Sequence, residues 1–414
     1  MWQKRLIIIA LLVFTFSFIQ GQALTPKEQS YLDKHAINIG VDSTYAHGDW
    51  SSVLEEVKDK KIILLGEYNH GSREVFASRN DLIMSLHKEL GFDVILFEAG
   101  IGELAEINIQ KDTMNAKRLT AGFFTIWTTP EFVQLMAYVK EHNISIGGFD
   151  VQRSGATFNA LLQREASVRN IDASYYSSIE KRFSEVNSLL ANKTTVFDAV
   201  NVPITDLIKE YERLKEAFKH LRVNNTSESS LLIEKTIDNR VAYLKYRLAF
   251  IKDKDYRKRW KARDLAMANN VEWLISNFYP NKKVLIIGHN FHTARYNEKE
   301  EVMGEFLSKK YGSQMYSLAI YGAEGSFHGN YGNLILTKAP ETDRLDIKYI
   351  IKTMPGKVHF LHLPKRDTKH THWMFNKIVI NDSFIDLSGS NEIILSRHFD
   401  GLLLLDKVTP PDID

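Results

Sequence analysis

The stretch KIILLGEYNHGSRE, residues 61–74, contains the pattern that decides the fold. Four consecutive apolar residues, 62–65, end at Gly66 and are followed closely by the ionisable side chains of Glu67 and His70. A continuous apolar run of this length is typical of a strand that is buried on both faces, as strands of parallel sheets are. We therefore predict a buried strand over residues 62–65 that leads into residues able to do chemistry.

Helical and strand patterns alternate after this stretch. Residues 72–90 keep apolar side chains at approximately helical spacing, and Gly91 is well placed to end that helix. Short apolar runs bounded by glycine or polar turn residues predict further strands. These runs lie at residues 94–97, 144–146, 284–287, 316–320 and 399–405. The alternation predicts an α/β fold in which helices flank a mostly parallel central sheet.

Between about residues 160 and 260 the strand patterns disappear, and the sequence becomes charged with a helical periodicity. An apolar stripe at i, i+3, i+4 and i+7 runs from Ile204 to Leu221, and a second helix is expected around residues 243–250. We interpret this block as a helical insertion that forms a cap or a cleft wall over the sheet. A free-standing coiled-coil arm is the alternative, although the heptads are not sustained.

The first 23 residues have the pattern of a secretory signal peptide. Lys4 and Arg5 precede a short apolar run, and small residues stand at Gly21 and Ala23, a spacing that signal peptidases prefer. The run is short for a membrane span, so an uncleaved anchor is the less favoured interpretation. We expect cleavage after Gly21 or Ala23. The domain of residues 24–414 is then periplasmic or secreted, with no stable membrane anchor.

The amino-acid composition excludes several classes of binding site and catalytic site. The 53 basic residues nearly balance the 51 acidic residues, so the broad basic field that nucleic-acid binding requires is missing. The chain contains no cysteine, which excludes disulfides, thiolate metal sites and a cysteine nucleophile. It also lacks the serine nucleophile elbow, the phosphate-binding loop, the His-Glu-x-x-His zinc helix and the dinucleotide-binding glycine pattern. The remaining functions are hydrolysis by an activated water molecule and ligand binding without catalysis.

Ionisable residues follow four of the predicted strands. They are Glu67 with His70, then Glu98, then Asp150, and finally His289 with His292. The carboxyl ends of parallel strands meet at one edge of a sheet, and ligands of open α/β folds bind at that edge. The sequence therefore predicts one shared site.

Two of these residues suggest roles in acid–base chemistry. His70 lies at the mouth of a predicted helix, where a neutral imidazole can act as a base while a carboxylate holds its other nitrogen. Glu98 is expected to be half-buried and therefore to need a cationic partner, for which Arg79 is the first candidate and Arg73 the second. Glu67 could instead cap the helix that follows it.

The two late histidines leave a metal site open. His289 and His292 are three residues apart, and on one helical turn this spacing suits a metal ion or an oxyanion equally. One alternative is a metallohydrolase, because mixed histidine and carboxylate sets bind zinc or manganese. Its ligands would be Glu67, His70, Asp150, His289 and His292. We assign no metal from the sequence, and a divalent metal stays an open alternative.

Most of these residues belong to an ordered series of motifs that resembles the erythromycin esterase family. The opening block is LGEYNHGSRE at residues 65–74. The later blocks occur in the family's order: Arg79, Phe97-Glu98-Ala99, Trp127 with Thr129 and Glu131, His142-Asn143, Gly148-Phe149-Asp150, Arg263-Asp264 with Met267 and Asn270, His289-Asn290-Phe291-His292, Met303-Gly304 and Phe399-Asp400. The resemblance covers the chain from about residue 49 to residue 410.

The resemblance implies a compact α/β fold with a helical insertion, a deep cleft and an ester hydrolase activity. In the family's proposed mechanism the histidine of the first motif, here His70, activates a water that attacks an ester carbonyl. Glu67, Glu98 and Arg79 fall on family positions that orient this histidine and shape the charge around it. Family members open the macrocyclic ester of macrolide antibiotics and so cause resistance, which makes a macrolactone the first substrate to consider.

The resemblance also implies that His289 and His292 line the cleft. We expect them to contact the substrate together with Asp150 and Arg73. The expected partner is a small-molecule ester, and no cofactor is required. The alternative of a different class is a non-catalytic haem- or ligand-binding protein, because the fold also resembles that of iron-regulated haem-binding lipoproteins and histidines ligate haem.

Overall fold

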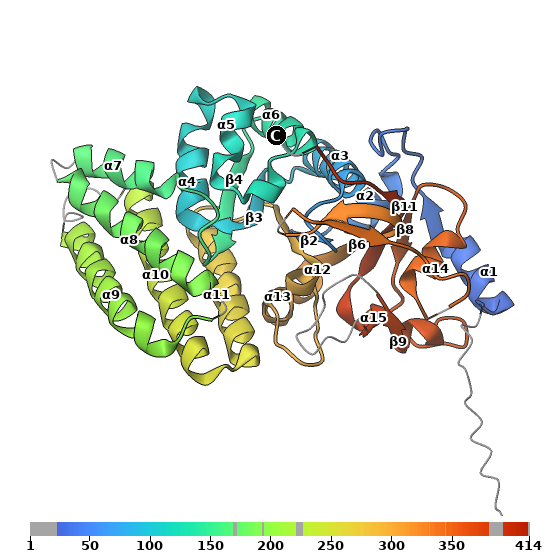
Figure 1. Ribbon diagram of the computed structural model, residues 1–414. Helices are drawn as coiled ribbons and strands as arrows, with labels where there is room; N and C mark the ends of the chain where they lie inside the picture. The colour runs from blue at the N-terminus through green and yellow to red at the C-terminus, as the bar shows by residue number, and fades with distance from the viewer. Residues whose placement is uncertain are drawn as a thin grey trace, which may run out of the picture.

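A single large sheet forms the centre of the described chain (Figure 1). The computed structural model describes residues 23–168, 172–192, 194–220, 227–330, 332–343, 345–380 and 392–412. Among these residues, nine strands pair in the order β1-β8-β11-β6-β2-β5-β3-β4, with β7 paired to β6. They span Ala36–Asn38 (β1), Ile62–Glu67 (β2), Val94–Gly100 (β3), Ser145–Asp150 (β4), Val284–His289 (β5), Met315–His328 (β6), Leu334–Thr337 (β7), Val358–His362 (β8) and Gly401–Val408 (β11). A separate pair consists of Lys377–Val379 (β9) and Glu392–Ile394 (β10).

From β11 to β4 in this order, each strand is parallel to the next, whereas β8 and β1 at one end and β7 beside β6 are antiparallel. The prediction of a mostly parallel sheet is therefore confirmed, and each predicted strand falls on an observed one. The observed strands reach further than their apolar runs, since β2 continues to Glu67 and β4 continues to Asp150. The last strand starts at Gly401, two residues later than predicted.

Helices occupy both faces and one side of the sheet. Those described are Pro26–His35 (α1), Ser51–Val57 (α2), Arg73–Leu90 (α3), Ile101–Gln110 (α4), Ala116–Leu119 (α5), Pro130–Glu141 (α6), Phe158–Val168 (α7), Ala173–Ala191 (α8), Phe197–His220 (α9), Glu228–Asp253 (α10), Tyr256–Asn277 (α11), Asn290–Thr293 (α12), Met303–Tyr311 (α13), Ile347–Lys352 (α14) and Leu395–His398 (α15). The helix predicted over residues 72–90 is α3, and Gly91 ends it in the left-handed conformation, with φ of 71°.

The sheet is buried on both faces, which explains the continuous apolar runs. Leu65 and Ile287 belong to an apolar cluster that also contains residues of α3 and α6. Their neighbours Leu64 and Ile286 belong to a second cluster, on residues of α11 and α13. Because successive side chains of a strand point to opposite faces, burial of both faces requires an apolar residue at every position.

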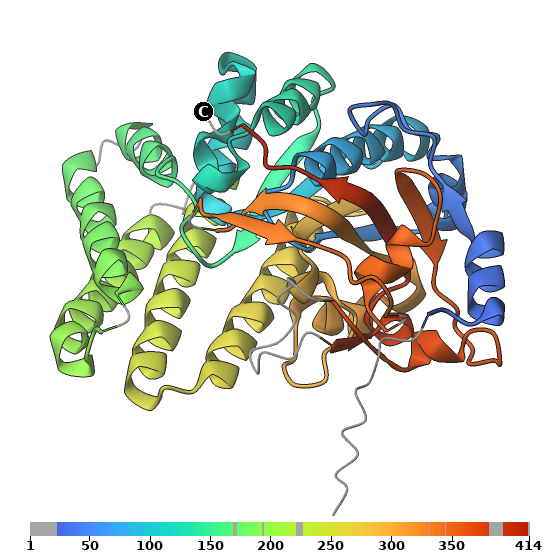
Figure 2. The ribbon, with the colours of Figure 1, turned by 45° about the vertical axis from the view of Figure 1, so that its right-hand side comes forward.

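The described chain between β4 and β5 contains only helices, α7 to α11. Figures 1 and 2 show this block on the side of the molecule opposite α1. The helices share an apolar core of their own, to which the predicted stripe of α9 contributes. The members of the stripe in that core are Ile204, Leu207, Tyr211, Leu214 and Phe218. The block is therefore a compact helical insertion.

A buried charge cluster joins the insertion to the rest of the molecule. Arg240 of α10 is only 1% exposed, and its Nη2 donates to Glu103 Oε1 of α4 at 2.6 Å and to Glu180 Oε2 of α8 at 3.3 Å. Tyr211 of α9 donates its hydroxyl to Glu180 at 2.5 Å. These contacts dock the insertion onto α4, next to the sheet, so it does not form the free-standing arm that was the alternative.

The predicted signal peptide lies outside the described residues except for residue 23. Among the helices that the structure describes, none combines the length and the apolar character that crossing a membrane requires.

Candidate active site

Four neighbouring strands bring the predicted site residues to one edge of the sheet. In the order β2, β5, β3, β4, the strands end with or carry Glu67, His289, Glu98 and Asp150. Glu67 lies directly opposite His289 in the β2–β5 register, and Asp150 lies opposite Gly100 in the β3–β4 register. The shared carboxyl edge expected from the sequence therefore forms, although β2 and β5 are separated by more than half of the chain.

His70 lies just beyond β2, and one of its two ring nitrogens is hydrogen-bonded to the protein. Its Nδ1 is 2.6 Å from Glu67 Oε1, so Nδ1–H donates to the carboxylate. Its Nε2 makes no hydrogen bond to any described residue, and the side chain remains 16% exposed. An imidazole held in this tautomer presents the lone pair of Nε2 to a molecule that approaches the edge of the sheet.

Arg79 of α3 holds the other oxygen of the Glu67 carboxylate. Its Nη1 donates to Glu67 Oε2, and both side chains are fully buried. The guanidinium lies over the rings of Phe76 and Trp127, 5.0 and 5.2 Å from their centroids. Since the ring of Trp127 is also 6.1 Å from that of His70, the base, its carboxylate and the arginine form one packed unit.

The charges around His70 favour its protonated form. Burial by itself lowers the pKa of the imidazole, but the hydrogen bond to Glu67 and the negative charges of Glu67 and Glu98 outweigh burial. The pKa of His70 is therefore raised above its ordinary value of 6.5. Arg79 acts in the opposite direction and limits the rise. Proton transfer from water is most efficient when the pKa of the base lies near the working pH.

Glu98 pairs with Arg263 of α11, so the prediction that Arg79 or Arg73 is its cationic partner is wrong. Arg263 Nη2 donates to Glu98 Oε1 at 2.8 Å and to Asp150 Oδ2 at 2.6 Å. Burial would raise the pKa of Glu98, but the neighbouring His292 and Arg263 hold it well below its usual range. Arg263 enters from the end of the insertion, which the spacing of the strand motifs could not reveal.

His289 is held neutral by two hydrogen bonds to the backbone. Its Nε2–H donates to the carbonyl oxygen of Tyr68 at 2.9 Å, and its Nδ1 accepts from the N–H of Phe291 at 3.1 Å. Burial and the nearby His70 lower the pKa of His289 to about 3. The ring lies 5.4 Å from that of His70, so His289 is a wall of the site with no ring nitrogen to spare.

His292 lies beneath the edge, and the structure does not place it on an open surface. It is 3% exposed, its Nδ1 is 2.8 Å from Asp264 Oδ1, and its Nε2 accepts from Arg263 Nη1 at 2.8 Å. Both ring nitrogens are therefore engaged. His292 fixes the guanidinium of Arg263, which in turn holds Glu98 and Asp150.

Arg73 is the one predicted site residue that the structure does not bring to this cluster. Its Nη2 is 3.0 Å from Asp412 Oδ2 and its Nε is 3.5 Å from Glu131 Oε1, and the side chain is 40% exposed. Arg73 follows the site in sequence, but it is the first residue of α3, and its partners Asp412 and Glu131 lie outside the cluster.

Three residues of the network received no role from the sequence. Arg263 and Asp264 were part of a quoted motif, and Trp260 stands one turn earlier on α11. The ring of Trp260 lies 6.0 Å from that of His292, and Arg263 lies over the same indole at 5.5 Å. Only the motif containing Arg263 and Asp264 could have pointed to them, because nothing in their spacing relates α11 to the strand ends.

The carboxylates of the site already have strong partners. Glu67 is held by Arg79, and Glu98 and Asp150 are held by Arg263. Throughout the described ranges, no group of three or more His, Cys, Asp or Glu side chains is placed to hold a metal ion. A metal at this edge would have to displace an arginine from a buried ion pair.

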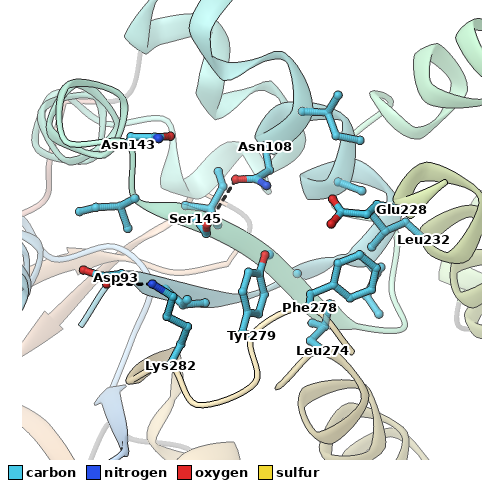
Figure 3. Close-up of a pocket in the computed structure, with 18 of the residues that line it drawn as sticks. Asp93, Asn108, Asn143, Ser145, Glu228, Leu232, Leu274, Phe278, Tyr279 and Lys282 are labelled. Carbon is cyan, nitrogen blue, oxygen red and sulfur yellow. Dashed lines mark hydrogen bonds and ion pairs between the residues drawn. The ribbon is translucent and has the colours of Figure 1, made fainter. Parts of the chain in front are cut away.

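A separate cavity of about 470 Å³ lies at the opposite edge of the sheet (Figure 3). It opens beside the amino ends of β3 and β4, where Asp93 and Ser145 line it, and Asn108 of α4 faces it from above. Leu274 and Tyr279, from the end of α11 and the turn after it, close its other side. It contains none of the clustered histidines.

Similar proteins were found among curated sequences. The chain is 26% identical to YbfO of Bacillus subtilis (strain 168), whose name assigns it to the hydrolases without a substrate, over 98% of this chain and 99% of that protein. It is 25% identical to the erythromycin esterase type II of Escherichia coli, over 59% of this chain and 64% of that protein.

Solved structures share the fold at low sequence identity. A Bacillus cereus protein and a succinoglycan biosynthesis protein each superpose with a TM-score of 0.72 at 18% identity, covering 94% and 95% of this chain and 98% and 100% of theirs. A mutant of the erythromycin esterase EreC in its open conformation superposes with a TM-score of 0.65 at 14% identity, covering 92% of this chain and 99% of its own.

The sequence model of the erythromycin esterase family matches residues 87–408, which is most of the chain. The match contains Glu98, Asp150, Arg263 and His289, and the residues of the first motif precede it. Together with the shared fold, this match shows that the chain belongs to the erythromycin esterase family.

Proposed function

We propose that this protein hydrolyses a carboxylic ester with a water molecule that His70 activates. One observation carries the proposal. Among the three clustered histidines, His289 and His292 use both ring nitrogens in contacts with the protein. His70 donates Nδ1–H to Glu67, and its Nε2 has no hydrogen-bond partner in the described part of the chain. That arrangement is the one a general base requires.

In the proposed reaction, His70 Nε2 takes a proton from water while the water oxygen attacks the ester carbonyl carbon. The tetrahedral intermediate then collapses, the bond between carbon and the alcohol oxygen breaks, and the imidazolium returns the proton to the departing alkoxide. The products are a carboxylic acid and an alcohol, and His70 is neutral again. No covalent acyl-enzyme forms, since no serine or cysteine nucleophile takes part.

The buried ion pair behind His70 prepares it for this step. Glu67 holds the tautomer with the proton on Nδ1 and stabilises the imidazolium that forms during attack. Arg79 neutralises the charge of Glu67 in the resting state and limits the rise in the pKa of His70. A positioned base of this kind contributes about 10²–10⁴-fold to the rate.

A metal-dependent mechanism is the second candidate, and the arginine pairs argue against it. Glu67, Glu98 and Asp150 would each have to leave a buried guanidinium to ligate an ion. Breaking such a pair leaves an uncompensated buried charge and costs several kcal/mol. We therefore propose that no cofactor is required and that the partner is a small-molecule ester, with the macrolactones that the relatives' name suggests as the first compounds to test.

The test uses His70→Ala beside His372→Ala, which removes a histidine that is 67% exposed and far along the chain. Both variants and the unmodified protein are incubated with macrolides and simple esters, with and without a chelator. Mass spectrometry then measures the masses and amounts of the products. We expect a product that is heavier than the ester by one water. The rate at which it forms should fall about 10²–10⁴-fold in His70→Ala and stay unchanged in the control.

Two results would contradict the proposal. Full hydrolysis by a folded His70→Ala variant would remove His70 as the base. Loss of activity on chelation, restored by zinc or manganese, would put the metal-dependent mechanism first.

A further inference from the structure

The hairpin of α10 and α11 beside the site carries two arginines, Arg247 and Arg259, that have no counter-ion among the residues that the structure describes. Arg263 is paired with two carboxylates, but Arg259, one turn earlier on α11, makes no hydrogen bond or ion pair with its side chain to any described residue. Its guanidinium lies over the rings of Phe250 and Trp260, 4.7 and 5.4 Å from their centroids. The side chain is half-buried.

Arg247 of α10 is the second of these arginines. Its Nη2 donates to the carbonyl oxygen of Leu190, and its guanidinium lies 5.8 Å from the ring centroid of Tyr243. Its Nε is buried and has no hydrogen-bond partner among the described residues. No described carboxylate lies within ion-pair distance of this side chain, which is also half-buried.

The positive charge of Arg247 acts on Arg259. Burial lowers the pKa of Arg259, and the positive charges of Arg247 and Arg263 lower it further. Asp255 of the same hairpin is engaged at the start of α11, where it accepts from Lys258 N at 3.0 Å and pairs with Lys258 Nζ at 3.5 Å. Two half-buried positive charges without a counter-ion are unfavourable unless an anion joins them.

Arg259 is linked to the proposed site through Trp260. Trp260 stands between Arg259 and Arg263, and its ring is 6.0 Å from that of His292. Tyr246, whose ring lies 5.4 Å from that of Tyr243, lines a cavity of about 180 Å³ together with Arg259. Asp253, Asp255 and Lys258 also line that cavity.

We propose that Arg247 and Arg259 form an anion subsite, so that the ester hydrolysed at His70 carries a carboxylate or a phosphate group. This inference rests on the proposed function. Arginine suits the role because its planar guanidinium binds either group through two hydrogen bonds. The ring of Tyr243 beside Arg247 and that of Trp260 beside Arg259 lower the local dielectric constant, which strengthens the interaction with a bound anion.

The test compares two esters that share a leaving group, the neutral 4-nitrophenyl acetate and the anionic mono-(4-nitrophenyl) succinate. The variants are Arg247→Gln, Arg259→Gln and Arg257→Gln, the last being a matched control because Arg257 is exposed on the same helix. The ratio of kcat/KM for the anionic ester to that for the neutral ester should fall about tenfold in the first two variants. It should stay unchanged in Arg257→Gln.

Calorimetric titration with succinate and with inorganic phosphate, at an ionic strength of about 20 mM, separates this proposal from the proposed function. If the unmodified protein hydrolyses both esters and the ratio does not change in Arg259→Gln or Arg247→Gln, the subsite is overturned while the hydrolase stands. If neither ester is hydrolysed, the calorimetric titration alone tests the subsite. Binding of either anion that weakens about tenfold in Arg259→Gln and not in Arg257→Gln supports the subsite, and absent or unchanged binding overturns it.

Discussion

At the scale of single residues, the hydrogen bonds of each imidazole decide what it can do. His70, His289 and His292 are equally capable of base chemistry in the sequence. In the structure, both ring nitrogens of His289 are hydrogen-bonded to backbone groups, and both ring nitrogens of His292 are hydrogen-bonded to Asp264 and Arg263. The partners of His292 lie on α11, far from the strand motifs in the sequence, and those of His289 are backbone groups, which a residue pattern does not reveal. The sequence could therefore propose all three histidines and could not choose among them.

The Glu67–His70 pair predicts a pH dependence. A base must be neutral to accept a proton, so kcat/KM should rise with pH through the pKa of His70, which lies above 6.5. In Glu67→Gln the hydrogen bond to a carboxylate and its negative charge are lost, and burial and Arg79 then lower the pKa of His70. The acidic limb of the profile should therefore move to lower pH while the plateau falls.

The measurement is kcat/KM for one ester across the neutral range, with Glu55→Gln as a control because Glu55 is exposed and pairs only with Lys58. Circular dichroism establishes that each variant is folded. An acidic limb that stays in place or moves to higher pH in Glu67→Gln would show that Glu67 does not set the pKa of the base.

At the scale of elements, the end of α3 shows how a local rule can be read correctly from sequence. Gly91 has a φ of 71°, and nothing lies within 4 Å of a Cβ built on it, so a side chain there meets only backbone strain. Gly91→Ala should lower the free energy of unfolding by about 1–2 kcal/mol. Gly40 is the matched control, because its surroundings are equally open and its φ is not positive.

Urea unfolding of both variants measures the difference. Gly40→Ala should change stability by less than about 0.5 kcal/mol. Equal effects of the two substitutions would mean that the left-handed conformation of Gly91 carries no cost for alanine.

The docking of the insertion depends on charges that no sequence pattern predicts. Arg240 pairs with Glu103 and Glu180, and it is the cation that both buried carboxylates share. Burial and the charge of Glu180 raise the pKa of Glu103, despite Arg240. Arg240→Met should therefore destabilise the fold by about 3–5 kcal/mol, because it leaves the carboxylates buried without a cation.

Replacing all three residues by apolar ones, as Arg240→Met with Glu103→Leu and Glu180→Leu, should recover most of that loss. Urea unfolding of the single and triple variants tests this. A single variant that loses less than about 1 kcal/mol would show that water reaches the carboxylates.

At the scale of the whole molecule, the sequence predicted the layers better than the site. Six parallel strands and a helical insertion follow from the periods of the apolar residues, and each strand run was recognisable because both of its neighbouring layers are apolar. The pairing of Glu98 with Arg263 was missed, since it joins β3 to α11 across the insertion. Sequence periodicity specifies which face of an element is buried, but not which distant charge it meets.

We also propose that the whole protein is exported, on the pattern of residues 1–23. Expression in a bacterium that secretes through the general pathway should yield a periplasmic protein whose first residue is Gln22 or Leu24, measured by intact mass and N-terminal sequencing. Replacing Leu11 by Arg in the apolar run should keep the full-length chain in the cytoplasm. A full-length chain recovered from the periplasm would contradict cleavage, and one recovered from the membrane would favour the uncleaved anchor.

The order of the strands has a consequence for how the molecule folds. β5 lies between β2 and β3 in the sheet, yet it follows both in the chain, after the entire insertion. Until β5 pairs with them, β2 and β3, the strands that carry Glu67 and Glu98, each have an unpaired edge, and such edges are templates for aggregation. Closing such a long loop is slow, but an insertion that first collapses around its own apolar core leaves only a short distance to close. The helical insertion that brings Arg263 to the site thus also shortens the loop that must close before β5 can pair with β2 and β3.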